Sequence, residues 1–325
     1  MDRRTFIGTL TSSLLAMPPT ARAQQAGKVP VVGVLHPDIG PRANILDNAR
    51  QGLRDLGYVD GKNIAFEVRF AGEKPETFPG LAADLVRRKV DVLLTIGPAA
   101  LRAARDATSA IPIVAYDLES DPVEAGFARS LAQPGGNITG FFLDQPGLAG
   151  KWLELIRELV PGTRRVAVLV DTTTGPWQLA SIKRAAEKLG IELQIVEIRN
   201  SATLDKALGA GVKGGSLALV QLSSPLFNTR AKRIAEFTME HRLPAISMFR
   251  RFAEAGGLMA YGPSQVEYSK RPAVYIDKIL KGPKPADLPI EQPTKFNYVI
   301  NLKTAKVLGL KIPQSVLVRA DEVIE

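Results

Sequence analysis

The fold is decided by residues 90–115, VDVLLTIGPAALRAARDATSAIPIVA, in which two short apolar runs flank a longer segment. The runs at 90–95 and 111–115 are rich in Val, Ile and Leu, which is typical of buried strands. Residues 99–107 between them have the apolar spacing of a helix. Because two parallel strands need a crossover connection, this order predicts a parallel sheet covered by helices.

The same alternation continues on both sides of this unit. Turn residues at 133–137 separate a first set of strands and helices from a second set that repeats the pattern. The other predicted strands lie at 31–35, 63–69, 138–142, 165–170, 192–198, 216–222, 244–247, 256–262 and 296–301. We therefore expect an α/β protein of two doubly wound, Rossmann-like lobes joined by hinge crossovers, with a ligand between the lobes.

The composition excludes several classes of function. The chain has 325 residues, 45% of them hydrophobic and 23% charged, which suits a folded protein of about two domains. It has no Cys, so disulfides, thiolate metal sites and cysteine nucleophiles are excluded, and with only two His we expect no metal or other cofactor. The net charge of +9 is scattered over the chain, so we expect no nucleic-acid partner.

The first 23 residues are typical of a secretory signal peptide. Arg3 and Arg4 precede an apolar run at 6–17, and Ala21-Arg22-Ala23 forms a cleavage site before Gln24. The paired arginines also resemble a twin-arginine signal, although Ile7 and Gly8 depart from its usual ending, so both export routes stay open. Since no other apolar stretch is long enough to span a bilayer, we expect a soluble periplasmic protein.

Motifs of catalysis and of nucleotide binding are missing from the sequence. Residues 209–214 satisfy G-x-G-x-x-G, but they follow a predicted helix and precede a strand, which is the reverse of a dinucleotide site. The sequence has neither a G-x-S-x-G elbow nor a phosphate-binding loop. We therefore predict that the protein is not an enzyme.

Four strings in the chain carry a family resemblance. They are QGLRDLGY at 51–58, QPGGNITG at 133–140, KGPKPADLP at 281–289 and VINLKTAK at 299–306. Together they resemble the ABC-transporter substrate-binding protein family that includes bacterial tryptophan and tyrosine binders. The resemblance implies a type I periplasmic binding fold, an absence of catalysis, and a permease in the inner membrane as the partner of a monomeric binding protein.

The expected division of the chain follows from the crossings. We assign residues 28–143 and 258–283 to lobe one, because the strand at 258–261 directs the next helix back to the first lobe. Residues 144–257 and 284–325 are assigned to lobe two.

Candidate ligand-binding residues are those that follow the carboxyl ends of the predicted strands, where helix N-termini offer free N–H groups. They are His36, Asp38, Gly97, Pro98, Ala99, Tyr116, Asp117, Glu119, Asp171, Thr172, Thr173, Gln221, Ser223 and Phe249. The alternative reading is that the hydroxyl side chains among them only cap helices.

We expect the ligand to be a small molecule with a carboxylate, with an aromatic or large apolar amino acid as the best candidate. Its carboxylate is expected at the turns 97–99 and 172–173, its ammonium at Asp117 or Asp171, and its side chain at Tyr116 or Phe249. Two other functions stay open. A sensor module for a membrane receptor would share this fold and pocket, and a secreted α/β enzyme would show strongly shifted acid–base groups facing each other in the cleft.

Overall fold

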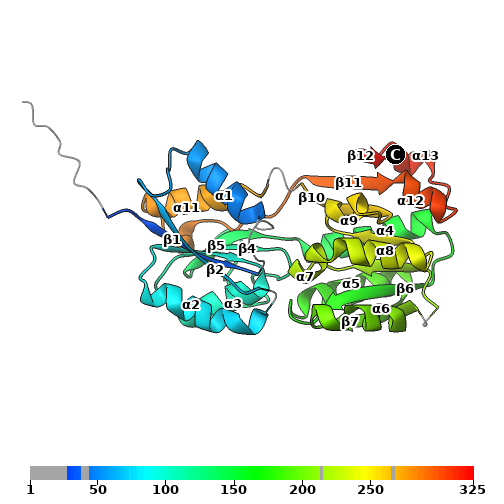
Figure 1. Ribbon diagram of the computed structural model, residues 1–325, viewed down its shortest axis with the longest axis horizontal. Coiled ribbons are helices and arrows are strands. Elements are labelled where there is room, and N and C mark those ends of the chain that lie inside the picture. The colour runs from blue at the N-terminus through cyan, green and yellow to red at the C-terminus, as the bar shows by residue number, and fades with distance from the viewer. Residues whose placement is uncertain (1–27, 38–43, 73, 213–214, 265–267) are drawn as a thin grey trace, which may run out of the picture.

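The computed structural model describes residues 28–37, 44–72, 74–212, 215–264 and 268–325, which form two α/β lobes lying side by side (Figure 1). The predicted signal peptide, residues 1–23, lies outside the described residues. Each lobe is built on one mainly parallel sheet, so the predicted fold class is confirmed. Among the helices that are described, none has the length and apolarity needed to cross a membrane.

Lobe one is a parallel sheet of five strands with helices on both faces. The strands, in spatial order, are β2 (Ala65–Phe70), β1 (Val31–His36), β3 (Val92–Ile96), β4 (Ile113–Asp117) and β5 (Ile138–Phe142). Helices α1 (Asn44–Asp55) and α11 (Arg271–Leu280) cover one face, and α2 (Phe78–Arg87) and α3 (Pro98–Ala107) cover the other (Figure 1). Because both faces are covered, Val92 packs in the core beneath α1 while its neighbour Leu93 packs beneath α2 and α3.

Lobe two is a sheet of seven strands. In spatial order they are β12 (Glu322–Ile324), β11 (Phe296–Asn301), β10 (Met259–Pro263), β9 (Ala245–Ser247), β8 (Ala218–Gln221), β6 (Arg165–Asp171) and β7 (Glu192–Ile198). Strands β10 and β11 are antiparallel, and the other neighbouring pairs are parallel.

Helices cover both faces of this second sheet. Helices α4 (Gln145–Leu159) and α5 (Trp177–Leu189) pack on one face, and α6 (Leu204–Val212), α8 (Ala231–Glu240) and α9 (Arg250–Glu254) pack on the other. The shorter elements are α7 (Pro225–Thr229), α12 (Leu302–Val307), α13 (Gln314–Leu317) and the 3₁₀ turns η2 (Pro75–Thr77), η3 (Ser201–Thr203) and η4 (Pro285–Asp287).

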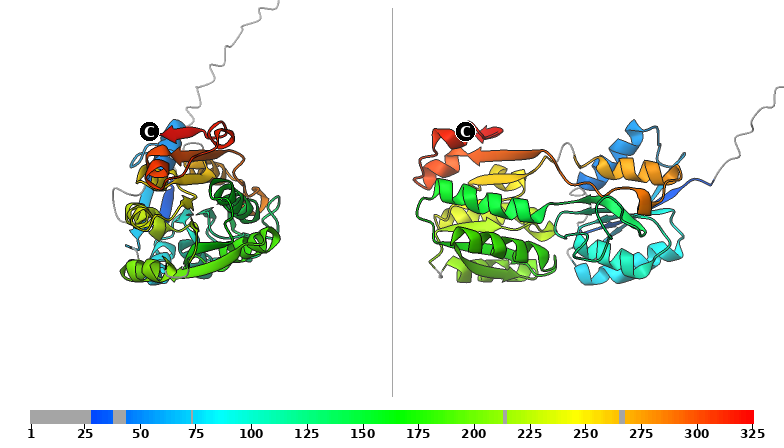
Figure 2. Two further views of the ribbon diagram at one scale, coloured as in Figure 1. Left: turned by 90° about the vertical axis from the view of Figure 1, so that its right-hand side faces the viewer. Right: turned by 180° about the vertical axis from the view of Figure 1, so that it is seen from behind.

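Among the described elements, the chain changes lobe three times: between β5 and α4, between β10 and α11, and between α11 and β11 (Figure 2). The predicted segment 258–283 is divided between the lobes. Strand β10 pairs with β9 and β11 in the second sheet, which corrects its assignment to lobe one, while α11 packs against α1 and β5 in lobe one.

The segment that follows α11 also departs from the expected division. Leu288 O accepts a hydrogen bond from Thr139 Oγ1 at 2.7 Å, and Glu291 N donates to Gly140 O at 2.9 Å, so residues 288–291 run along the edge strand β5 of lobe one. After α11, the chain rejoins the second sheet only at β11. The strands β10 and β11 pair with strands from other parts of the chain, and their own sequences do not specify which strands those partners are.

Candidate functional site

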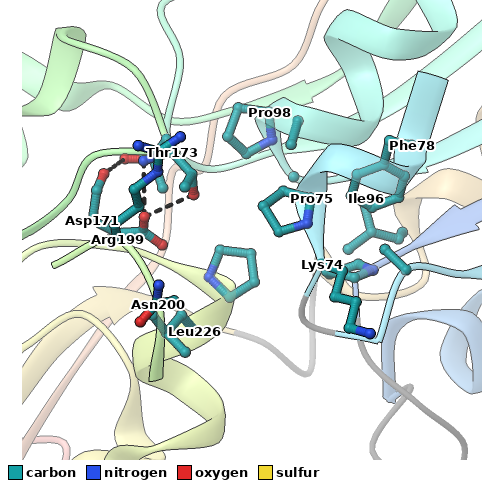
Figure 3. A pocket seen from close by; sticks show the side chains of 16 residues that line it. Lys74, Pro75, Phe78, Ile96, Pro98, Asp171, Thr173, Arg199, Asn200 and Leu226 are labelled. Carbon is teal, nitrogen blue, oxygen red and sulfur yellow. Dashed lines mark hydrogen bonds between the residues drawn. The ribbon is translucent and has the colours of Figure 1, made fainter. Parts of the chain in front are cut away.

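A cavity of about 590 Å³, part of it open to solvent, lies between the lobes (Figure 3). Its walls come from residues that follow strand ends in both sheets, as expected for a ligand site in an α/β protein. Phe78, Ile96 and Pro98 form an apolar wall on lobe one, and Leu226 lies opposite on lobe two. Pro225 also lines the cavity from lobe two. The cavity therefore suits a ligand with an apolar body.

The turn that begins α3 brings backbone close to this cavity. Gly97 has a φ of 81°, which favours glycine, and its N–H donates to Tyr116 O at 2.9 Å. A Cβ atom at this position would lie 3.3 Å from Pro225 Cγ of the other lobe. Pro98 then occupies the first turn of the helix, where a missing N–H is harmless. The first turn of α3 thus presents its N-terminal end to the cavity between the two lobes.

The loop after β6 forms the opposite wall. Asp171 is 3% exposed, and its Oδ1 accepts hydrogen bonds from Thr173 N at 2.9 Å and from Thr173 Oγ1 at 2.7 Å. Its Oδ2 accepts a hydrogen bond from Ser224 Oγ at 2.5 Å. Thr173 O in turn accepts a hydrogen bond at 2.6 Å from an Nη atom of Arg102 on lobe one. Asp171 therefore holds its own loop in the shape that Arg102 contacts.

A second contact between the lobes is sealed from solvent. Ser223 Oγ donates to Glu119 Oε1, and both residues are almost fully buried. The Ser223 backbone is held by Gln178, which donates to its carbonyl and accepts from its N–H, each at 2.8 Å. Asp117 lies behind Glu119, and its Oδ1 accepts from the N–H groups of Glu119 and Ser120.

Burial controls the acidity of these two carboxyl groups. Burial, followed by the neighbouring negative charge of Asp117, holds the pKa of Glu119 well above its ordinary value. Burial also raises the pKa of Asp117, whose Oδ2 has no hydrogen-bond partner within the described residues. These are the shifted acidic groups that an enzyme would need in its cleft, but neither of them lines the cavity.

The structure brings five of the predicted ligand-binding residues to the cavity wall: Gly97, Pro98, Ala99, Asp171 and Thr173. Eight others are described but do not line it: His36, Tyr116, Asp117, Glu119, Thr172, Gln221, Ser223 and Phe249. Asp38 lies outside the described residues. Tyr116 stacks on Phe141 in the core, and Phe249 is also a core residue, so the aromatic walls predicted from the sequence are directed away from the cavity.

Several lining residues were not anticipated from the sequence. Arg199 and Asn200 directly follow β7, so the strand-end rule contained the signal for them. Pro75 begins η2, Phe78 begins α2, and Lys74 immediately precedes η2, so these residues follow the connection after β2. No strand-end rule selects residues that far along the chain.

A metal centre has no support in the described residues, where no group of three His, Asp or Glu side chains is placed to hold an ion. The carboxyl groups nearest to the cavity form hydrogen bonds with serine, threonine and backbone donors instead.

Comparison with known proteins finds relatives of this chain among binding proteins. The family model for ABC transporter substrate binding proteins matches residues 31–324. A tyrosine-binding protein from Clostridioides difficile (strain R20291) is 28% identical over 272 residues, which are 82% of this chain and 78% of the relative.

Two solved structures show the fold in two forms. An ABC domain from Streptococcus pneumonia in complex with L-Trp is 24% identical, with 91% of this chain and 99% of the other covered and a TM-score of 0.83. A ligand-free, open substrate-binding protein from Clostridium difficile has the same identity and coverages but a TM-score of 0.63. Both structures share the two-lobed fold described above.

Proposed function

Because the chain belongs to the ABC transporter substrate-binding protein family, we propose that it captures a small carboxylate-bearing ligand between its lobes and presents it to an ABC importer. The observation that carries this proposal is the cavity, whose walls come from both lobes. A ligand held there contacts both lobes at once and therefore stabilises their closed arrangement. No catalytic step is part of the proposal, since the family is one of substrate-binding proteins.

The turn at 97–99 is the proposed site for the ligand carboxylate. The N–H of Gly97 is engaged by Tyr116 O, and Pro98 has no N–H. The donors for the ligand are therefore the next N–H groups of the first turn, from Ala99 onward, which have no partner within the helix. The positive end of the helix dipole also favours a negative charge by about 0.3–1 kcal/mol at exposed positions. Gly97 allows the ligand close to this backbone because it has no side chain.

The apolar wall formed by Phe78, Ile96 and Leu226 is the proposed site for the ligand body. The tyrosine-binding relative makes aromatic and large apolar amino acids the first group to test, together with acids of the same shape. This chain and that relative differ at most positions, so the name of the relative supports a ligand class and leaves the compound open.

The periplasm is the proposed compartment and an inner-membrane permease the proposed partner of a monomeric binding protein. This part of the proposal is supported by the signal-like residues 1–23 and by the family. Mass spectrometry of the exported protein should give an N-terminus at or near Gln24. Retention of residues 1–23 on a membrane-bound protein would refute this assignment.

A thermal-shift screen of ligand-depleted protein tests the central proposal. Amino acids, aromatic acids, short carboxylates and sugars are compared at equal concentration. A ligand present at 100 times its Kd should stabilise the protein by about 2.7 kcal/mol. Stabilisation by sugars alone, with no response to any carboxylate, would reject the proposed function.

A further inference from the structure

The charged side chains around the cavity restrict the class of ligand that it can bind. Resting on the proposed function, we infer that the ligand is an organic anion that combines a carboxylate with an apolar body and carries no ammonium group. The inference follows from which carboxylates are already engaged and which cations are free at the cavity wall.

An ammonium group needs a carboxylate or several carbonyl acceptors. Among the described lining residues, Asp171 is the single carboxylate, and its oxygens already accept three hydrogen bonds. Those bonds come from Thr173 and Ser224 within the same lobe, and Asp171 is only 3% exposed. Turning this carboxylate toward a ligand would leave the hydroxyl and N–H donors of its loop without acceptors, which is unfavourable in a buried loop.

The other two carboxylates between the lobes are engaged elsewhere. Glu119 accepts from Ser223 of the opposite lobe, and Asp117 accepts from two backbone N–H groups at Oδ1, while its Oδ2, which has no partner among the described residues, is buried. Neither residue lines the cavity. A ligand ammonium in the cavity therefore meets no available carboxylate in the part of the site that the structure describes.

Cations, in contrast, line the cavity from both sides. Lys74 belongs to lobe one and Arg199 to lobe two, and both side chains are exposed (Figure 3). Within the described residues, neither side chain forms a hydrogen bond or an ion pair. An anionic ligand is attracted by both groups, whereas an ammonium would add a third positive charge near them.

The apolar wall completes the argument. Phe78, Ile96 and Leu226 provide no hydrogen-bond partner for an ammonium, because their side chains are hydrocarbons. Moving a charged ammonium from water to such a wall is unfavourable unless a partner is present. A hydrocarbon or aromatic body in the same place has no charge that must be removed from water.

Matched ligands that differ by one group test the inference. The probes are 3-phenylpropanoate, phenylalanine and 2-phenylethylamine, with 4-methylpentanoate, leucine and 3-methylbutylamine as an aliphatic set. Each is titrated into ligand-depleted protein by isothermal calorimetry at low ionic strength. We expect the best acid to bind about tenfold or more tightly than its amino acid, and neither amine to bind.

The outcomes separate this inference from the proposed function. An amino acid that binds as tightly as its acid, or with less than a tenfold deficit, overturns the inference and leaves the proposed function standing. Failure of every carboxylate in both sets overturns the two together.

Substitution of a cation provides a second measurement. Arg199→Gln should weaken binding of the best acid by about fivefold, as expected for one exposed charge pair, and raised salt should reduce that difference. Arg251→Gln is the matched control, because Arg251 is exposed on α9 and does not line the cavity. Equal affinities of the two variants at low salt would overturn the inference.

Discussion

The lobes meet in two chemically different ways. On the cavity side, Arg102 donates to Thr173 O beside a partly open space. On the sealed side, Ser223 donates to Glu119, and each of these residues is no more than 3% exposed. Water or ligand atoms can replace a lost partner on the cavity side, but nothing can do so on the sealed side. The same type of hydrogen bond therefore has different energetic consequences in the two places.

This difference assigns separate roles to the two contacts. The sealed contact forms only when the lobes close, and it is complete without a ligand. The cavity walls contain the cations of Lys74 and Arg199 and apolar surface, so they respond to the ligand. We therefore expect the sealed side to set how far closure is favoured and the cavity side to set which ligand favours it.

Removal of the sealed donor should have the largest effect. Ser223→Ala leaves the buried Glu119 carboxyl group without its partner from the other lobe, at a cost of about 1–3 kcal/mol to the closed arrangement. Calorimetry should show ligand affinity reduced by about 5- to 150-fold, and small-angle scattering should show a larger radius of gyration. Ser315→Ala, on an exposed residue, is the control. Unchanged affinity in Ser223→Ala would show that the sealed contact does not control closure.

A methyl group at Gly97 should have the next largest effect. Gly97→Ala places a side chain on a residue with a φ of 81° and brings it 3.3 Å from Pro225 of the other lobe, so strain of about 1–2 kcal/mol is expected. Gly80→Ala is the matched control, since a Cβ at Gly80 within α2 meets nothing within 4 Å and should stabilise the helix by about 0.5–1 kcal/mol. Chemical denaturation should move the two variants in opposite directions. A shift of both in the same direction would contradict the role given to Gly97.

The secondary structure was predictable from the sequence because each element has its own apolar period. The helix predicted at 99–107 is α3, Pro98–Ala107, and the strand predicted at 165–170 is β6, Arg165–Asp171. The placement of β10 was not predictable in the same way, because its partners β9 and β11 are chosen by the whole sheet. Local periodicity specifies that a strand exists, and it contains little information about which sheet the strand joins.

The cavity wall was predictable only where a lining residue directly follows a strand. Gly97 and Thr173 satisfy that rule, and Arg199 satisfies it although it was not selected. Asp117 also ends a strand, but its side chain lies on the face covered by α3, beneath the turn that lines the cavity. Strand ends locate a region of the lobe, whereas the direction of each side chain decides what it contacts.

The ligand affinity should depend on pH through the sealed contact. Lobe opening exposes Glu119 to water, where its pKa returns toward the ordinary value, and closure raises that pKa again through burial and Asp117. The closed form therefore binds the extra proton, and affinity is highest at low pH. It should fall by at most tenfold per pH unit as the pH rises through the raised pKa, and level off above it.

Calorimetry from pH 5 to pH 9 measures this dependence, and Glu119→Gln should reduce it while Ser315→Ala retains it. The groups that interact with Glu119 are Asp117, Ser223, Tyr116 and the cation of Arg102, whose charge partly offsets that of Asp117. Affinity that rises with pH in the unmodified protein would show that closure does not take up a proton at this contact.

Arg102→Met should have the smallest effect, although it removes the interlobe hydrogen-bond donor on the cavity side. The substitution loses a bond of about 1 kcal/mol to Thr173 O, but that carbonyl lies beside the cavity, where water can take its place. It also removes a partly buried cation: burial lowers the pKa of Arg102, and its Nη1 has no partner among the described residues. The loss and the gain oppose each other, so calorimetry should show ligand affinity changed by less than about fivefold. An effect as large as that of Ser223→Ala would show that the cavity side, too, is closed to water, and the distinction between the two contacts would then fail.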